Sequence, residues 1–207
     1  MPVRSDPETC RPWQEDFSRH LHQHPELPRQ EHETAAAVAD RLRASGYEVT
    51  EGIGGTGVVG LLHNGDGPSV LLRADMDALP VEEATGLPYA SRVRSTYGDS
   101  PEQVAVMHAC GHDVHVTCLL GAADLLARHR DAWGGTVVAL FQPAEELGDG
   151  ARRMVDDGLA GIVGGVDVGL ARHVLPVCGV SVGPLSGPFP AAAQAAAEEP
   201  IANALKI

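Results

Sequence analysis

The stretch from Met107 to Gln142 reads MHACGHDVHVTCLLGAADLLARHRDAWGGTVVALFQ and carries the clearest signal for fold class. Apolar residues recur at helical spacing from Val114 to His129, which predicts a long helix. The apolar, β-branched run from Thr136 to Phe141 then predicts a buried strand. A long helix followed by a buried strand is typical of an α/β protein, in which helices cover the faces of a sheet.

Elements of the same two kinds lie on both sides of this stretch. Helical spacing runs from Pro12 to Ser45, with a break at His24 and Pro25 that predicts two helices joined by a turn, because proline interrupts a helix. Gly46 provides a stop for the second helix. Short strands are predicted over 47–53, 57–64, 69–75, 166–170 and 179–182, and a further helix over 150–157. The alternation predicts a sheet flanked by helices.

Composition predicts one soluble globular domain and limits its partners. The chain has 207 residues, is 43% hydrophobic and carries a formal net charge of −13. Nucleic acids and anionic membranes require a basic face, so neither is expected as a partner. The sequence has no apolar run of the roughly 18 residues that span a membrane, and its first residues do not resemble a signal peptide. The four cysteines lack a disulfide-framework spacing, so a cytoplasmic location is predicted.

A dense set of potential ligands opens the long helix. The segment from Met107 to His115 contains one thiol, three imidazoles and one carboxylate. Cys110 and His112 point to the same side if residues 110–112 are extended, and a glycine between them permits that conformation. Thiolate and imidazole together suit Zn, Mn, Co or Ni. Asp113 either orients an imidazole or caps the helix.

A second set of ligands follows the buried strand. Pro143 ends the strand, and Glu145 and Glu146 come directly after it. In open α/β sheets, ligands bind beyond the carboxyl ends of the strands. Because adjacent side chains diverge, one carboxylate can bind a metal while its neighbour acts as a base toward a water molecule. The equally weighted alternative is an acidic helix N-terminus, favoured by the helix dipole.

Two further strand ends carry polar groups, whereas three other motifs are discounted. Asp75 and Asp77 follow one strand and His173 follows another, so these groups are expected to converge at one sheet edge. The GxGxxG pattern at 52–57 precedes a predicted strand, although dinucleotide binding requires a helix there. An HExxH reading of the segment that begins at His32 fails, because its second histidine is missing. The pair His20 and His24 is interpreted as surface histidines.

Five segments in this order resemble the M20 family of metallopeptidase-related amidohydrolases. The resemblance is to the subgroup of hippurate hydrolases, N-acyl-amino-acid amidohydrolases and auxin-conjugate hydrolases. It extends from about Trp13 to Leu185 and rests on LHQHPEL (21–27), RADMDALP (73–80), MHACGHDVH (107–115), FQPAEE (141–146) and RHVLP (172–176). It implies a zinc-peptidase-like α/β catalytic domain with a mixed central sheet flanked by helices, interrupted by a lid domain used for dimerisation.

The resemblance also implies residue roles and an activity. Matched by position, the metal ligands would be Cys110, His112, Glu146 and His173, the general base Glu145, and the supporting residues Asp75 and Asp77. The cofactor would be a divalent metal, with two ions per site, and the partner a small N-acyl amino acid. The implied reaction is hydrolysis of an amide bond to a carboxylate and an amino acid.

The sequence departs from the family pattern after the last motif. It contains no histidine beyond His173, although the family uses one more as a ligand, and nothing resembles the lid domain. We therefore expect an incomplete catalytic domain over residues 1–185, followed by an Ala- and Pro-rich tail over 186–207 that is disordered or a frayed helix. Without a lid, the usual homodimer is not expected. The alternative function is an inactive metal-binding remnant of such an enzyme.

Overall fold

The computed structural model describes residues 7–98 and 100–174, with side chains from Pro12 onward. The predictions for 179–182 and for the tail at 186–207 lie outside the described residues. The elements are α1 (Pro7–Gln23), α2 (His32–Ala44), β1 (Glu48–Ile53), β2 (Gly57–Asn64), β3 (Ser69–Asp75), β4 (Arg94–Thr96), β5 (Gln103–Ala105), α3 (His112–Arg128), the 3-10 helix η2 (Arg130–Ala132), β6 (Gly135–Gln142), the 3-10 helix η3 (Glu145–Leu147), α4 (Gly150–Asp156), α5 (Leu159–Val163) and β7 (Val168–Ala171).

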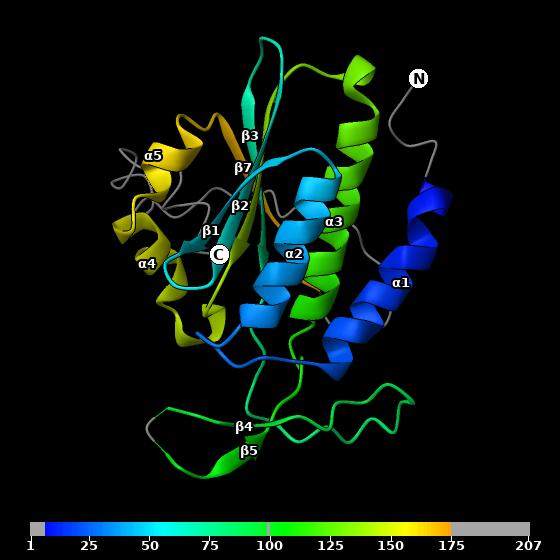
Figure 1. Ribbon diagram of the computed structural model, residues 1–207, viewed down its shortest axis with the longest axis vertical. Coiled ribbons are helices and arrows are strands. Elements are labelled where there is room, and N and C mark those ends of the chain that lie inside the picture. The colour runs from blue at the N-terminus through cyan, green and yellow to red at the C-terminus, as the bar shows by residue number, and fades with distance from the viewer. Residues whose placement is uncertain (1–6, 99, 175–207) are drawn as a thin grey trace.

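Five strands form one mixed sheet in the order β1-β2-β6-β3-β7. β1 pairs with β2 and β2 with β6 in antiparallel fashion, whereas β3 runs parallel to both β6 and β7. Figure 1 shows α1, α2 and α3 against one face of this sheet and α4 and α5 against the other. The predicted α/β class with a mixed sheet flanked by helices is therefore confirmed.

β6 is apolar from Val137 to Phe141, where both of its faces are buried. Ala139 and Phe141 face the core shared with α1, α2 and α3, and Val138 and Leu140 face the core under α4 and α5. All four side chains are fully buried. The continuous apolar run in the sequence is thus two interleaved faces of one central strand.

A small substructure lies beyond the sheet, at the bottom of Figure 1. β4 and β5 pair there as a two-stranded ribbon. Leu27, Ala78 and Val106 form a separate small core beneath it. These two strands were not predicted, because each is only three residues long and has no buried side chain.

Among the described residues, no helix combines the length and hydrophobicity of a membrane span.

Several boundaries follow local backbone chemistry. α3 begins at His112, two residues before the predicted start, because Gly111 takes the left-handed conformation (φ 79°) that precedes the first turn. The GxGxxG segment forms the turn between β1 and β2, as expected. β7 begins at Val168 instead of residue 166. His20 and His24 are exposed, in agreement with their interpretation as surface histidines.

Candidate metal centre

Three parallel strands bring the candidate site together. β3, β6 and β7 all point the same way, so Asp75, the segment after Gln142 and the segment that contains His173 lie at one edge of the sheet. The N-terminus of α3, with His112, reaches the same edge, since its imidazole lies 3.6 Å from the Asp75 carboxylate. The expected convergence of separate strand ends is what the structure has.

Cys110 and His112 meet Glu146 at this edge. One potential ligand atom from each residue lies within 4.8 Å of the other two. The prediction that residues 110–112 are extended is wrong, because Gly111 is left-handed and His112 already belongs to α3. A side chain at position 111 would also collide with Val174, since a Cβ there would lie 2.5 Å from Val174 Cγ2. Glycine therefore serves both the turn and the close approach.

Asp77 holds one ring nitrogen of His112, and the other ring nitrogen has no hydrogen bond. Its Nδ1 lies 2.8 Å from the main-chain oxygen of Asp77 and 3.2 Å from Oδ1, so Nδ1–H is the donor. The other carboxylate oxygen of Asp77 accepts the main-chain N–H of Glu146 at 2.9 Å. Nε2 of His112 and Oε1 of Glu146 are buried and have no hydrogen-bond partner. Buried polar atoms are normally paired, so these two indicate a missing ligand.

The charges at the site favour a cation. Burial lowers the pKa of His112, but the hydrogen bond to Asp77 and the nearby Asp75 charge outweigh it and raise that pKa. Burial, together with Glu146 and Glu145, raises the pKa of the Cys110 thiol to about 12. Without a cation the thiol therefore stays protonated at neutral pH. A metal ion that replaces these protons would suit the thiol, imidazole and carboxylate donors.

Asp75 belongs to a buried hydrogen-bond chain under the site. Arg73 donates Nη1–H to Asp75 at 2.7 Å, and its Nε and Nη2 both donate to Gln142. His115 Nδ1 lies 2.5 Å from the other oxygen of Asp75. Burial alone would raise the pKa of Asp75, but the hydrogen bond from His115 and the charges of His112 and Arg73 hold it well below its usual range. Asp75 is therefore an ionised, fully engaged carboxylate.

The carboxylates of Glu145 and Glu146 both lie near Nε2 of His112, at 3.8 and 3.9 Å, but they belong to different groups of potential ligands. The carboxylate of Glu146 groups with Cys110 and His112, whereas that of Glu145 groups with Asp75 and His112. The two residues begin η3, which has three residues and so provides almost no helix dipole. The alternative of an acidic helix N-terminus is therefore not supported. Burial, reinforced by the negative Asp75 and Glu146, raises the pKa of Glu145 despite the opposing charge of His112.

Glu31, which no sequence pattern indicated as a functional residue, holds this turn. It is fully buried, and its carboxylate accepts the main-chain N–H of Ala144 at 2.8 Å and the hydroxyl of Thr56 at 2.6 Å. Ala144 has a left-handed backbone (φ 48°), which is costly for a residue with a Cβ. The hydrogen bond to Glu31 compensates for that cost. No local pattern could reveal this role, because Ala144 is 113 positions away in the sequence.

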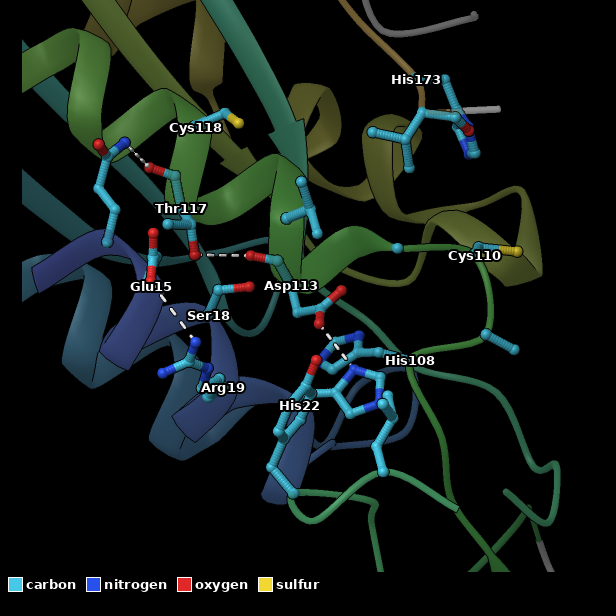
Figure 2. Close-up of a pocket in the computed structure, with 17 residues that line it drawn as sticks. Glu15, Ser18, Arg19, His22, His108, Cys110, Asp113, Thr117, Cys118 and His173 are labelled. Atoms are coloured by element: carbon cyan, nitrogen blue, oxygen red, sulfur yellow. Dashed lines mark hydrogen bonds and ion pairs between the residues drawn. The ribbon is translucent and has the colours of Figure 1, made fainter. Parts of the chain in front are cut away.

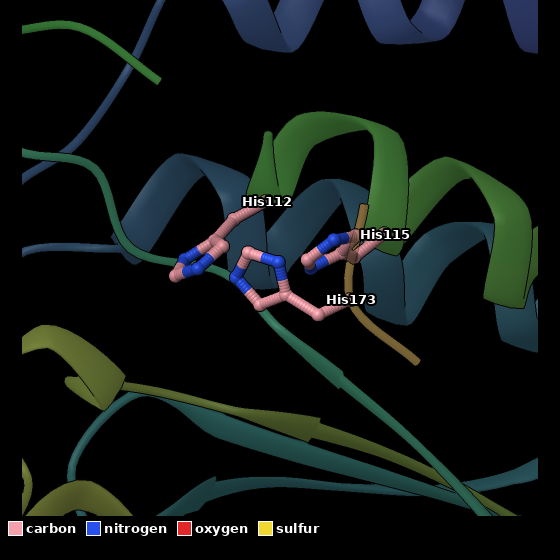
Figure 3. Close-up of side chains that lie close together, drawn as sticks. All are labelled: His112, His115 and His173. Atoms are coloured by element: carbon pink, nitrogen blue, oxygen red, sulfur yellow. The ribbon is translucent and has the colours of Figure 1, made fainter. Parts of the chain in front are cut away.

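His173 comes near the site from the end of β7. Its ring centroid lies 5.8 Å from that of His112 and 4.6 Å from that of His115, and Figure 3 shows the three rings together. One nitrogen from each of the three rings forms another possible metal-binding group. His173 is exposed and is not in the group that contains Cys110 and Glu146.

Of the two roles predicted for Asp113, the structure has the contact with an imidazole, although that imidazole belongs to His22 and not to a candidate metal ligand. It makes no capping hydrogen bond to α3, and its carboxylate lies 2.8 Å from Nδ1 of His22 on α1. That hydrogen bond, opposed by burial and helped by Glu83, raises the pKa of His22 to about 9. His108 nearby is buried with both ring nitrogens unpartnered, and burial lowers its pKa to about 4.

A pocket of about 1050 Å³ adjoins the candidate centre between α1 and α3. Figure 2 shows Cys110 and His173 at one side of it and His22, Asp113 and His108 grouped together. Most of its surface is apolar, with Leu87, Tyr89, Val114 and Val174 among the lining residues. The pocket places apolar surface beside the candidate ligands.

Comparisons with known proteins relate the chain to one family. The family model for peptidase family M20/M25/M40 matches residues 71–198. An N-acetyl-L-cysteine deacetylase from Bacillus subtilis is 43% identical over 176 residues, which cover 84% of this chain and 39% of that protein. A hippurate hydrolase from Campylobacter jejuni is 47% identical over 146 residues, which cover 70% of this chain and 35% of that protein.

A solved structure from Bacillus subtilis, described as a dinuclear metal binding peptidase from the M20 family, matches with a TM-score of 0.70 at 37% identity. The match covers 82% of this chain and 44% of that protein. The chain thus spans about two fifths of the length of these relatives.

Proposed function

The chain belongs to peptidase family M20/M25/M40, and on this basis we propose that it provides the metal centre of an amidohydrolase. The proposed reaction is cleavage of the amide bond of small N-acyl amino acids, which yields a carboxylate and an amino acid. Its relatives include proteins named for the removal of acetyl groups from N-acetyl-L-cysteine and for the hydrolysis of hippurate. Both names describe small N-acyl amino acids as substrates.

One observation carries the proposal. His112 Nε2 and Glu146 Oε1 are buried without hydrogen-bond partners and lie 3.9 Å apart, and both residues belong to one compact group with the Cys110 thiol. An ordinary core does not leave an imidazole nitrogen and a carboxylate oxygen without hydrogen bonds side by side. The thiol, imidazole and carboxylate donors suit a borderline divalent ion such as Zn, Mn, Co or Ni.

We assign the binding of two ions to Cys110, His112, Glu146 and His173. Divalent ions held there would polarise the amide carbonyl and lower the pKa of a water molecule. Asp77 orients the ligands, because it fixes Nδ1 of His112 and the main chain of Glu146. A thiol ligand is compatible with the predicted cytoplasmic location, where thiols are kept reduced.

Glu145 would carry the proton in this reaction. Its carboxylate lies 3.8 Å from Nε2 of His112 and is partly exposed, so a water molecule can reach it. Glu145 would take a proton from the attacking water and return it to the nitrogen of the leaving amine. Its raised pKa suits both halves of this transfer, since a base that is also an acid works best with a pKa near the working pH.

The test combines metal analysis with an assay on hippurate and N-acetyl amino acids. We expect the wild-type chain to bind two divalent ions and Glu146→Gln to lose metal. Glu145→Gln should keep its metal but lose turnover by a factor of about 10²–10⁴. Glu102→Gln, at an exposed position, is the matched control. A wild-type chain that binds no metal would overturn the proposal. Bound metal without turnover would favour the inactive metal-binding alternative.

A further inference from the structure

Both ring nitrogens of His115 are already used. Nδ1 lies 2.5 Å from a carboxylate oxygen of Asp75, and Nε2 lies 2.9 Å from the main-chain nitrogen of Val174. A carboxylate only accepts and a main-chain N–H only donates, so Nδ1 carries the proton and Nε2 is the acceptor. His112 differs, because its Nε2 is buried without a partner.

We infer that His115 is a positioning residue that fastens the segment carrying His173 to α3, and that it is not a metal ligand. The inference deepens the proposed function and rests on it, since it takes His173 as a ligand. The proximity of the three rings in Figure 3 would otherwise suggest a three-histidine metal site. Binding of a metal at Nε2 of His115 would release the N–H of Val174, whereas His112 can bind without losing any hydrogen bond.

The segment after β7 needs such an anchor. β7 has four residues and pairs with β3 through only one of its edges among the described residues. His173 lies two residues beyond its end, and its Nδ1 makes a hydrogen bond to the oxygen of the neighbouring Val174, at 2.6 Å. Val174 is held at two points: its N–H donates to His115, and its side chain lies against Gly111. The position of His173 is therefore coupled to the turn that carries Cys110.

The other side of His115 is held by the buried hydrogen-bond chain described above. Asp75 accepts from His115 and from Arg73, and Arg73 donates to Gln142 at the end of β6. This series of hydrogen bonds connects β6 through β3 to α3 and to the segment after β7. Because His115 is buried and both of its nitrogens are hydrogen-bonded, the ring cannot turn over without breaking both hydrogen bonds.

Two substitutions separate positioning from ligation. A glutamine amide can donate to Asp75 and accept from Val174, but it binds zinc poorly compared with imidazole. His115→Gln should therefore keep the zinc affinity to within about threefold, whereas His115→Ala should lower it by about 10–100-fold, as for other residues that orient ligands. His24→Gln, at an exposed position, is the matched control. Equal loss of affinity in His115→Gln and His115→Ala would overturn the inference.

Nitrogen NMR of the wild-type imidazoles gives a readout that does not depend on the variants. We expect His115 to show the Nδ1–H tautomer both before and after zinc is added, while the nitrogen signals of His112 and His173 shift. A zinc-induced shift at Nε2 of His115 like that of His112 would overturn the inference. If the wild-type chain binds no zinc, the proposed function fails. The metal-free spectrum then decides about the anchor: the Nδ1–H tautomer supports it, and the Nε2–H tautomer contradicts it.

Discussion

Replacement of Glu31 tests how the turn before the two candidate catalytic carboxylates is held. Glu31 is fully buried and accepts hydrogen bonds from the hydroxyl of Thr56 and the main-chain N–H of Ala144. Glu31→Ala would leave both donors buried and unpaired. It would also remove the contact that holds the left-handed backbone of Ala144 directly before Glu145 and Glu146.

The structure sets the size of the effect. Each buried donor left without a partner costs about 1–3 kcal/mol, so Glu31→Ala should lower the free energy of unfolding by about 3–5 kcal/mol. Glu31→Gln keeps an acceptor oxygen and should cost less. Burial raises the pKa of Glu31, which means that the folded chain pays to keep this carboxylate ionised, and the neutral amide avoids that cost. We expect a loss of about 1–2 kcal/mol for Glu31→Gln.

Urea unfolding followed by circular dichroism measures these differences, and zinc titration of the folded variants measures the effect on the site. Glu33→Gln is the matched control, because Glu33 is exposed and lies two residues further along the chain, in α2. Zinc affinity should fall about 10–100-fold in Glu31→Ala as the turn relaxes. Equal stability of Glu31→Ala and Glu33→Gln would contradict a stabilising role for Glu31. A destabilised Glu31→Ala with unchanged zinc affinity would refute the positioning of the carboxylates alone.

Three further predictions concern pH, packing and metal. The pKa of His22 is raised to about 9, chiefly by the hydrogen bond to Asp113. The stability that protonated His22 contributes is therefore complete below the unfolded pKa of 6.5 and is lost as the pH rises through 9. His22→Gln should remove about 1–2 kcal/mol of this pH-dependent stability, and the same pH dependence of urea unfolding in wild type and His22→Gln from pH 6 to 10 would contradict this. Gly150→Ala should lower the free energy of unfolding by more than about 3 kcal/mol, because its Cβ would lie 1.7 Å from the Pro143 oxygen. Gly161→Ala has open space around its Cβ in α5 and should raise the free energy of unfolding by about 0.5–1 kcal/mol in the same assay. Zinc should raise the thermal unfolding midpoint and a chelator should reverse the rise, by mass action; an unchanged midpoint would contradict the metal centre.

Most of the fold was predictable because its signals are local. The helical spacing of α2 and α3 and the apolar run of β6 lie within single segments, and each predicted element is present within a few residues of its expected bounds wherever the structure describes it. β4 and β5 were missed because three-residue strands bury no side chain of their own. The order of the strands was not predicted, because pairing depends on contacts between segments that are far apart in the chain.

The candidate site, like the fold, was predictable from the sequence only in part. Residue types and their places at the start of a helix or at the ends of strands pointed to Cys110, His112, Glu145, Glu146 and His173. The predicted extended conformation of residues 110–112 was wrong, because the left-handed Gly111 turns His112 into α3.

The chain alone therefore specifies which chemical groups stand at the ends of which elements, since periodicity and residue type are written along it. The fold assigns the supporting roles. Glu31 holds Ala144 across 113 positions, Asp113 pairs with His22 across 91, and His115 joins Asp75 across 40. Hydrogen bonds depend on distance and direction in space, and separation along the sequence contains neither. For that reason the histidine that looks most like a further ligand, His115, is identified as an anchor only by its two partners.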